Sequence, residues 1–213
     1  MPSVADAWRR IDDEVAARSQ GRTAVVAVSK AQSIEAIDEV VRAGCRRIGE
    51  NYAQELVGKR PRLPGGVEVH FIGQLQTNKV RLVADAVSLW QTVDRPGLVH
   101  EIAKRAPGAS VLIQVDLTDE PGKGGCSESD VDELLDLARS KGLSVRGLMT
   151  VGPTSGDIAT TRRVFAATRR LADSRGLPEV SMGMSADWTI GVDEGSTLVR
   201  IGTAIFGHRP PAS

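Results

Sequence analysis

The chain has few of the residues that bind metals or form disulfides. Its 213 residues include only two cysteines and three histidines. Cys45 and Cys126 lie far apart without CxxC spacing, and the histidines at positions 70, 100 and 208 show no HxxH or HExxH pattern. We therefore expect reduced, buried thiols and predict neither a disulfide nor a metal site.

The sequence also lacks an excess of either charge and any long apolar run. It carries 27 basic and 27 acidic residues, a formal net charge of zero, so no broad basic face is available for a nucleic acid. No apolar stretch approaches the roughly 20 residues of a membrane span, and the N-terminus lacks the basic-then-apolar pattern of a secretion signal. We expect a cytoplasmic monomer that binds neither nucleic acid nor membrane.

What the sequence does contain is a regular alternation of short apolar runs and longer amphipathic ones. An opening helix is predicted over residues 4–18, which Gln20 and Gly21 end. Eight strands are predicted after it, at residues 23–29, 46–49, 67–72, 86–92, 110–117, 144–149, 180–182 and 197–201. Ser33 and Ser127 are expected N-caps of helices.

Eight strand-then-helix repeats in about 200 residues favour a closed barrel over an open sheet, which usually has fewer strands. Gly44, Gly142 and Gly176 fall where the intervening helices should stop. The predicted fold is a single (β/α)8 TIM barrel with an additional N-terminal helix. It forms one domain over residues 1–213, with residues 210–213 as a flexible tail.

A barrel of this kind places its active site at the carboxyl ends of the strands. Lys30 follows the first predicted strand, Asn51 follows the second, and Met184 follows the seventh. A lysine at a strand end is usually a solvated amine with a pKa near 10.4, and a Schiff base requires the neutral amine. The low-dielectric mouth of a barrel favours that neutral form, so Lys30 is a candidate for covalent binding of a carbonyl compound.

The loops after the seventh and eighth strands are where barrel enzymes often hold a phosphate. Ser185 lies in the first loop, and Gly202 and Thr203 lie in the second. Ser185 alone could simply cap the next helix, and Gly202 and Thr203 alone could form an ordinary turn. The two loops together at this end of the barrel favour a phosphate-binding site. The glycine-rich residues 121–125 lack the order of a nucleotide-binding loop, and we interpret them as a loop at the barrel mouth where Lys123 contributes charge.

Six segments carry a resemblance to a known family, namely residues 27–30, 49–52, 70–79, 146–150, 181–187 and 199–207. In this order they resemble the pyridoxal 5′-phosphate (PLP) homeostasis proteins, single-domain relatives of the alanine racemase barrel. The resemblance implies PLP as a Schiff base on Lys30 and Arg200 near its pyridine nitrogen. The expected cofactor-binding residues are Lys30, Asn51, Met184, Ser185, Arg200, Gly202 and Thr203.

The resemblance also implies a role in PLP homeostasis and amino-acid balance, with PLP-dependent enzymes as recipients and no established turnover reaction. An amino-acid racemase is the alternative, but it needs acid/base groups on both faces of its substrate, and the only tyrosine here is Tyr52. A third reading is a Schiff-base aldolase in which Lys30 attacks a substrate carbonyl without a cofactor. The chain departs from the family pattern at Asp116, at residues 188–192 and in a shorter segment before the first strand.

Overall fold

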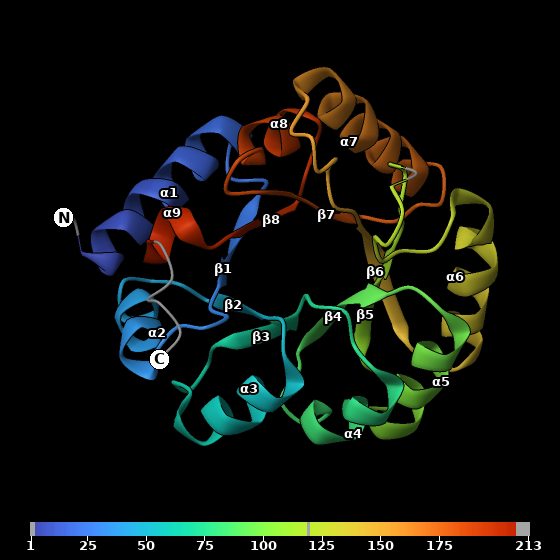
Figure 1. Cartoon of the computed structure of the whole chain (residues 1–213), viewed down its shortest axis with the longest axis horizontal. Coiled ribbons are helices and arrows are strands. Elements are labelled where there is room, and N and C mark those ends of the chain that lie inside the picture. The colour runs from blue at the N-terminus through green and yellow to red at the C-terminus, as the bar shows by residue number, and fades with distance from the viewer. Residues whose placement is uncertain (1–2, 119, 208–213) are drawn as a thin grey trace.

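The computed structural model describes residues 3–118 and 120–207, so the expected tail at residues 210–213 lies outside them. Eight parallel strands follow one another in sequence order and close into a barrel (Figure 1). The strands are β1 Ala24–Val28, β2 Arg47–Glu50, β3 Glu68–Phe71, β4 Leu89–Val93, β5 Ser110–Gln114, β6 Ser144–Met149, β7 Glu179–Met184 and β8 Leu198–Ile201. The (β/α)8 prediction is confirmed.

Helices surround the barrel as an outer ring. The α-helices are α1 Val4–Ser19, α2 Ile34–Arg42, α3 Ala53–Lys59, α4 Val80–Val83, α5 Pro96–Arg105, α6 Val131–Ser140, α7 Ile158–Asp173, α8 Trp188–Asp193 and α9 Thr203–Phe206. Three short 3₁₀ helices accompany them, η1 Arg60–Arg62, η2 Thr77–Lys79 and η3 Glu128–Asp130. The additional helix α1 packs against α2, α8 and α9, where the barrel closes between β8 and β1 (Figure 1).

The helix ends follow from local chemistry, with one exception. The Ser33 hydroxyl accepts a hydrogen bond from the Ala36 amide at 3.3 Å, as an N-cap should. The prediction for Ser127 is only half right, because it stands at the N-cap of η3 but its hydroxyl donates to the Asp130 carboxylate at 2.7 Å instead of capping an amide. The three predicted stops, Gly44, Gly142 and Gly176, all have positive φ, which glycine adopts without strain.

Apolar side chains fill two separate spaces. The larger core lies between the strands and the helices, and it takes Val25 and Ala27 from β1. The residue between them, Val26, belongs to a smaller buried cluster inside the barrel, because successive side chains of a strand point to opposite faces. The other members of that inner cluster are Leu89, Leu112, Met149 and Leu198.

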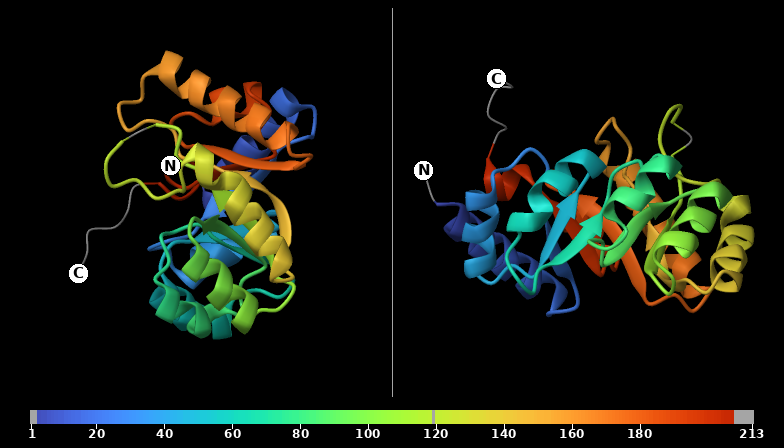
Figure 2. Two further views of the ribbon diagram at one scale, coloured as in Figure 1. Left: turned by 90° about the vertical axis from the view of Figure 1, so that its right-hand side faces the viewer. Right: turned by 90° about the horizontal axis from the view of Figure 1, so that it is seen from below.

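The strand predictions differ from the structure mainly at their ends. The fifth strand was expected to continue to residue 117, yet it ends at Gln114. The chain beyond it bends toward a different partner, since Val115 forms an isolated bridge with Cys126. The seventh strand is longer than predicted and continues to Met184. All strand arrows point to one side of the molecule, where α9 and the loops after β5 and β6 also lie (Figure 2).

Candidate functional site

The candidate residues gather on one arc of the barrel rim. Lys30, Asn51, Ser185 and Gly202 follow β1, β2, β7 and β8, and these strands are consecutive around the closed barrel in the order β7, β8, β1, β2. Sequence positions separated by more than 150 residues are therefore neighbours at the carboxyl ends of the strands. The structure brings the predicted set together, and Met184 and Thr203 lie beside Ser185 and Gly202 on the same arc.

The ends of β7 and β8 form a small group of polar donors. The Gly202 amide donates to the Ser185 hydroxyl at 3.2 Å, which joins the two loops directly. Gly202 is also the N-cap of α9, whose first residue is the exposed Thr203. A Cβ at position 202 would lie 3.4 Å from the Val28 Cβ, an ordinary contact, so the end of β8 lies directly beside the end of β1. Because the Ser185 hydroxyl accepts from Gly202, its own proton is available to an anion such as a phosphate at the start of α9.

The turn after β7 is itself held in place. The Met184 amide donates to the Asp187 carboxylate at 2.6 Å, and the Asp187 amide donates back to the Met184 carbonyl at 3.0 Å. These two bonds close a tight turn around Ser185. Ser185 therefore presents its hydroxyl from a fixed backbone, while the Met184 side chain is 38% exposed at the end of the strand.

Lys30 and Asn51 stand at corresponding positions just beyond the ends of the neighbouring strands β1 and β2. They lie two residues beyond Val28 and Gly49, which are register partners in β1 and β2. Lys30 is half-buried, and the side-chain oxygen of Asn51 is buried without a hydrogen-bond partner among the described residues. Gly73 sets this position, because any Cβ there would come within 2.1 Å of the Asn51 carbonyl oxygen. An unsatisfied acceptor beside Lys30 suits a polar ligand.

Arg200 lies inside the barrel beneath these residues. Its side chain is 3% exposed, and its guanidinium donates to the Ser181 hydroxyl at 2.7 Å and to the Thr150 carbonyl at 2.9 Å. Burial lowers the pKa of Arg200 to about 10, which still leaves it charged at neutral pH. Neither of these two partners carries a charge, so the site holds a buried cation with donors left over for a ligand acceptor.

A chain of hydrogen bonds continues from Arg200 through the barrel interior. The Ser181 hydroxyl donates to the side-chain oxygen of Gln91 at 2.7 Å, and the Gln91 nitrogen lies 2.8 Å from His70 Nδ1. Burial, reinforced by the charge of Arg47, lowers the pKa of His70 to about 3, so this imidazole is neutral. Its Nδ1 must then accept from Gln91 and its Nε2 carry the proton.

The sequence analysis did not identify the residues of this hydrogen-bonded network as part of the site. Gln91, His70 and Ser181 are polar residues in the middle of strands that are mainly apolar, and that contrast is the one feature that could have pointed to them. Whether such a residue faces the barrel interior depends on the register of its strand. The apolar pattern does not define that register to within one residue, and a shift of one residue moves the side chain to the other face.

A cavity of about 530 Å³ lies at the barrel mouth beside Asn51, with Tyr52, Lys79 and Lys123 among its lining residues. Lys123 was expected to contribute charge there. Its ammonium group donates to the Gly152 carbonyl at 2.6 Å and pairs with Glu120 at 3.0 Å, so its charge is largely compensated. The Tyr52 side chain is 55% exposed at the start of α3.

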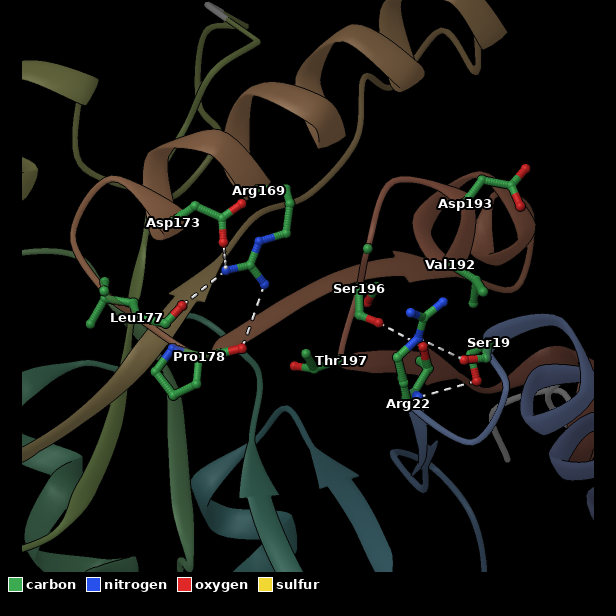
Figure 3. Close-up of a pocket in the computed structure, with 13 residues that line it drawn as sticks. Ser19, Arg22, Arg169, Asp173, Leu177, Pro178, Val192, Asp193, Ser196 and Thr197 are labelled. Carbon is green, nitrogen blue, oxygen red and sulfur yellow. Dashed lines mark hydrogen bonds and ion pairs between the residues drawn. The ribbon is translucent and has the colours of Figure 1, made fainter.

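A second cavity, of about 570 Å³, lies away from these residues at the amino-terminal side of β1 and β8 (Figure 3). Its two arginines are engaged by the protein: Arg169 pairs with Asp173 at 2.7 Å and donates to the Leu177 carbonyl at 2.9 Å. Arg22 donates to the Ser19 carbonyl at 3.0 Å. Because barrel chemistry resides at the opposite end, we do not assign the functional site here.

Both cysteines are free and buried, and burial raises the pKa of Cys45 and Cys126 to about 11. These thiols are therefore unreactive at neutral pH. Within residues 3–118 and 120–207, no group of three or more His, Cys, Asp and Glu side chains is placed to hold a metal ion. The same residues include no helix that is long and apolar enough to cross a membrane.

Comparison with known proteins identifies close relatives. Residues 5–210 match the family described as alanine racemase, N-terminal domain. The chain is 38% identical to the pyridoxal phosphate homeostasis protein of Vibrio alginolyticus, over 94% of this chain and 92% of the relative. It is 35% identical to the protein of the same name from Escherichia coli K12, over 98% of each chain.

Solved structures agree. PipY of Synechococcus elongatus with PLP bound superposes with a TM-score of 0.84 at 32% identity, over 96% of this chain and 100% of PipY. The form of PipY without PLP gives a TM-score of 0.86 at the same identity and coverage. Alanine racemase from Corynebacterium glutamicum shares only the fold, at 20% identity and a TM-score of 0.79, and the chain spans 62% of its length.

Proposed function

Since the chain belongs to the pyridoxal phosphate homeostasis protein family, we propose that it binds PLP covalently through Lys30 and acts in PLP homeostasis and amino-acid balance. The observation that carries the site assignment is the arc formed by β7, β8, β1 and β2, which places an amine, an anion cradle and a buried cation together. The proposal extends to a monomer in the cytoplasm that passes PLP to PLP-dependent enzymes.

The residues of the arc fit the chemical groups of PLP. The Ser185 hydroxyl and the Gly202 and Thr203 turn match the phosphate, and Arg200 offers unused donors to the pyridine nitrogen. The half-buried Asn51, whose buried side-chain oxygen has no partner among the described residues, lies on the Lys30 side of the arc, where it can meet a polar ring substituent.

When bound, PLP supplies an aldehyde that forms a covalent bond with an amine and a ring that withdraws electrons from that bond. The protein's part is to hold and orient. Lys30 would hold the aldehyde carbon, Ser185 and Gly202 would hold the phosphate, and Arg200, which keeps its own proton, would donate a hydrogen bond to the ring nitrogen. A ring nitrogen that accepts from Arg200 would stay unprotonated, which would weaken the stabilisation of a carbanion by the ring.

The site therefore favours storage and delivery over racemisation. A racemase needs a second acid/base group held against the opposite face of the substrate. Tyr52 is the only tyrosine, and its side chain is largely exposed and has no described partner that would orient it. The solved alanine racemases from Corynebacterium glutamicum and Clostridium difficile are 20% and 15% identical to this chain, which shows a common fold and carries no argument for racemase activity.

The proposal is tested by loading the purified protein with PLP, removing free PLP by gel filtration, and adding the apo form of an aminotransferase. We expect retention of close to one PLP per chain, a visible absorption band, and recovery of aminotransferase activity more slowly than with the same concentration of free PLP. A protein that emerges colourless and without PLP would refute the proposed function.

A further inference from the structure

A buried cluster of charged side chains lies directly behind Lys30. The ammonium group of Lys59, the last residue of α3, is 2.7 Å from the Glu50 carboxylate and 2.6 Å from the Glu55 carboxylate. Glu50 is fully buried and Lys59 is 8% exposed. Burying the Glu50 and Lys59 charges, with the half-buried Glu55 beside them, costs considerable desolvation energy, and well-packed apolar residues would often stabilise the fold as well or better. The cluster therefore calls for an explanation other than stability.

The cluster holds the main chain on both sides of Lys30. On one side, Lys59 donates to the Ser29 carbonyl at 2.6 Å, and the Ser29 hydroxyl donates to Glu50 at 2.7 Å. On the other side, the Ala31 amide donates to Glu55 at 2.5 Å. Lys30 is thus the second residue of a four-residue turn, 29–32, and the main chain on each side of it is bound by a charged side chain.

The backbone at Ala31 is strained. Its φ is 59°, a left-handed conformation that residues other than glycine rarely adopt. Only one other non-glycine residue of the described chain shares this feature, Gln20, which ends α1 as its left-handed C-cap. Ala31 ends no helix; it is the third residue of a turn that the Gln32 amide closes on the Ser29 carbonyl at 3.0 Å, and such a turn places positive φ at this position. The hydrogen bond from the Ala31 amide to Glu55 holds this strained turn in place. Strain of this kind accumulates next to functional groups.

Glu50 shows a second departure from a purely structural arrangement. Its oxygen Oε2 is buried and has no hydrogen-bond partner among the described residues. Burial raises the pKa of this carboxyl, and the hydrogen bond and charge of Lys59 oppose that rise. A buried oxygen without a hydrogen bond lowers the stability of the fold. The other oxygen of Glu50, Oε1, accepts hydrogen bonds from both Ser29 and Lys59.

From this geometry we propose that Glu50, Glu55 and Lys59 are positioning residues, which fix the turn at Lys30 so that its amine meets the aldehyde carbon of PLP. The inference rests on the proposed function. In the attachment step the neutral amine of Lys30 forms a bond to the aldehyde carbon, and the aldehyde oxygen leaves as water with the two amine protons. The step needs no further reagent, so the placement of the amine governs its rate.

The test compares PLP with pyridoxine 5′-phosphate, which has the same ring and phosphate but an alcohol in place of the aldehyde and therefore binds without covalent attachment. Glu55→Leu removes the acceptor for Ala31. We expect it to slow the growth of the PLP absorption band roughly 100-fold in stopped-flow mixing, with the affinity for pyridoxine 5′-phosphate unchanged within about threefold. Glu35→Leu, which removes an exposed partner of Arg62, is the matched control and should leave both unchanged.

Two further variants keep the test decisive. Glu50→Gln combined with Lys59→Met removes the buried charges together, so that neither is left unpaired, and should slow attachment with the same selectivity. Adding Ala31→Gly to Glu55→Leu should restore most of the rate, because glycine adopts positive φ without help. Equal losses for both ligands, unchanged rates in all variants, or no recovery with glycine would each overturn the proposal. Failure of the unaltered protein to attach PLP would instead refute the proposed function.

Discussion

The neutral, buried His70 should make the protein lose stability in mild acid. The pKa of His70 in the folded protein is about 3, below the ordinary value of 6.5. Between these two values the unfolded chain binds a proton that the folded chain does not, so stability falls as the pH drops below 6.5. Each pH unit within that window removes about 1.4 kcal/mol, and the loss between pH 7 and pH 5 is therefore roughly 2 kcal/mol.

Urea unfolding at pH 7 and pH 5 measures this loss when the protein is compared with its His70→Asn variant. Asparagine can offer an oxygen to Gln91 near the place of Nδ1, and it does not titrate. Glu50, whose raised pKa acts in the opposite direction, titrates alike in both proteins and cancels from the comparison.

We expect the free energy of unfolding to fall by roughly 2 kcal/mol more in the unaltered protein than in His70→Asn over this pH range. The exposed His100 provides a control, and His100→Asn should keep the pH dependence of the unaltered protein. If His70→Asn lost as much stability on acidification as the unaltered protein, the account of a neutral imidazole at the end of the Arg200 chain would be refuted.

Two other predictions concern the ligand. Ser185→Ala and Thr203→Val should each weaken the binding of PLP much more than that of pyridoxal, because charge-assisted hydrogen bonds to the phosphate are worth roughly 1.5 to 3 kcal/mol; equal losses in equilibrium dialysis would place the phosphate elsewhere. The loaded protein should also fail to racemise alanine at an enzymatic rate, and rapid Lys30-dependent interconversion of enantiomers that Tyr52→Phe abolishes would show a racemase instead.

The fold was predictable because each of its repeating units is a local pattern. Alternation of apolar runs and amphipathic segments identified all eight strands, and glycines with positive φ marked helix ends such as Gly44. Strand ends were predicted less accurately, as at Gln114. Beyond it Val115 still donates to the Met149 carbonyl of β6 but forms its bridge with Cys126, a partner that local sequence does not indicate.

The candidate site was predictable only in its outer parts. Lys30 and Ser185 stand at strand ends, and strand ends can be located from the sequence. The interior contacts could not be found in this way: Ser181 and Gln91 are 90 residues apart, and their hydrogen bond depends on the register of two strands that are not neighbours in the barrel. The hydrogen bond from Lys59 to the Ser29 carbonyl likewise depends on how α3 packs against the end of β1.

The attachment of PLP to Lys30 is the central claim, and reduction with borohydride followed by peptide mass mapping tests it most directly. The protein is incubated with one equivalent of PLP, reduced, digested and analysed by tandem mass spectrometry. We predict that the added phosphopyridoxyl mass lies on Lys30. A label on Lys79 or Lys123, with Lys30 unmodified, would contradict the account.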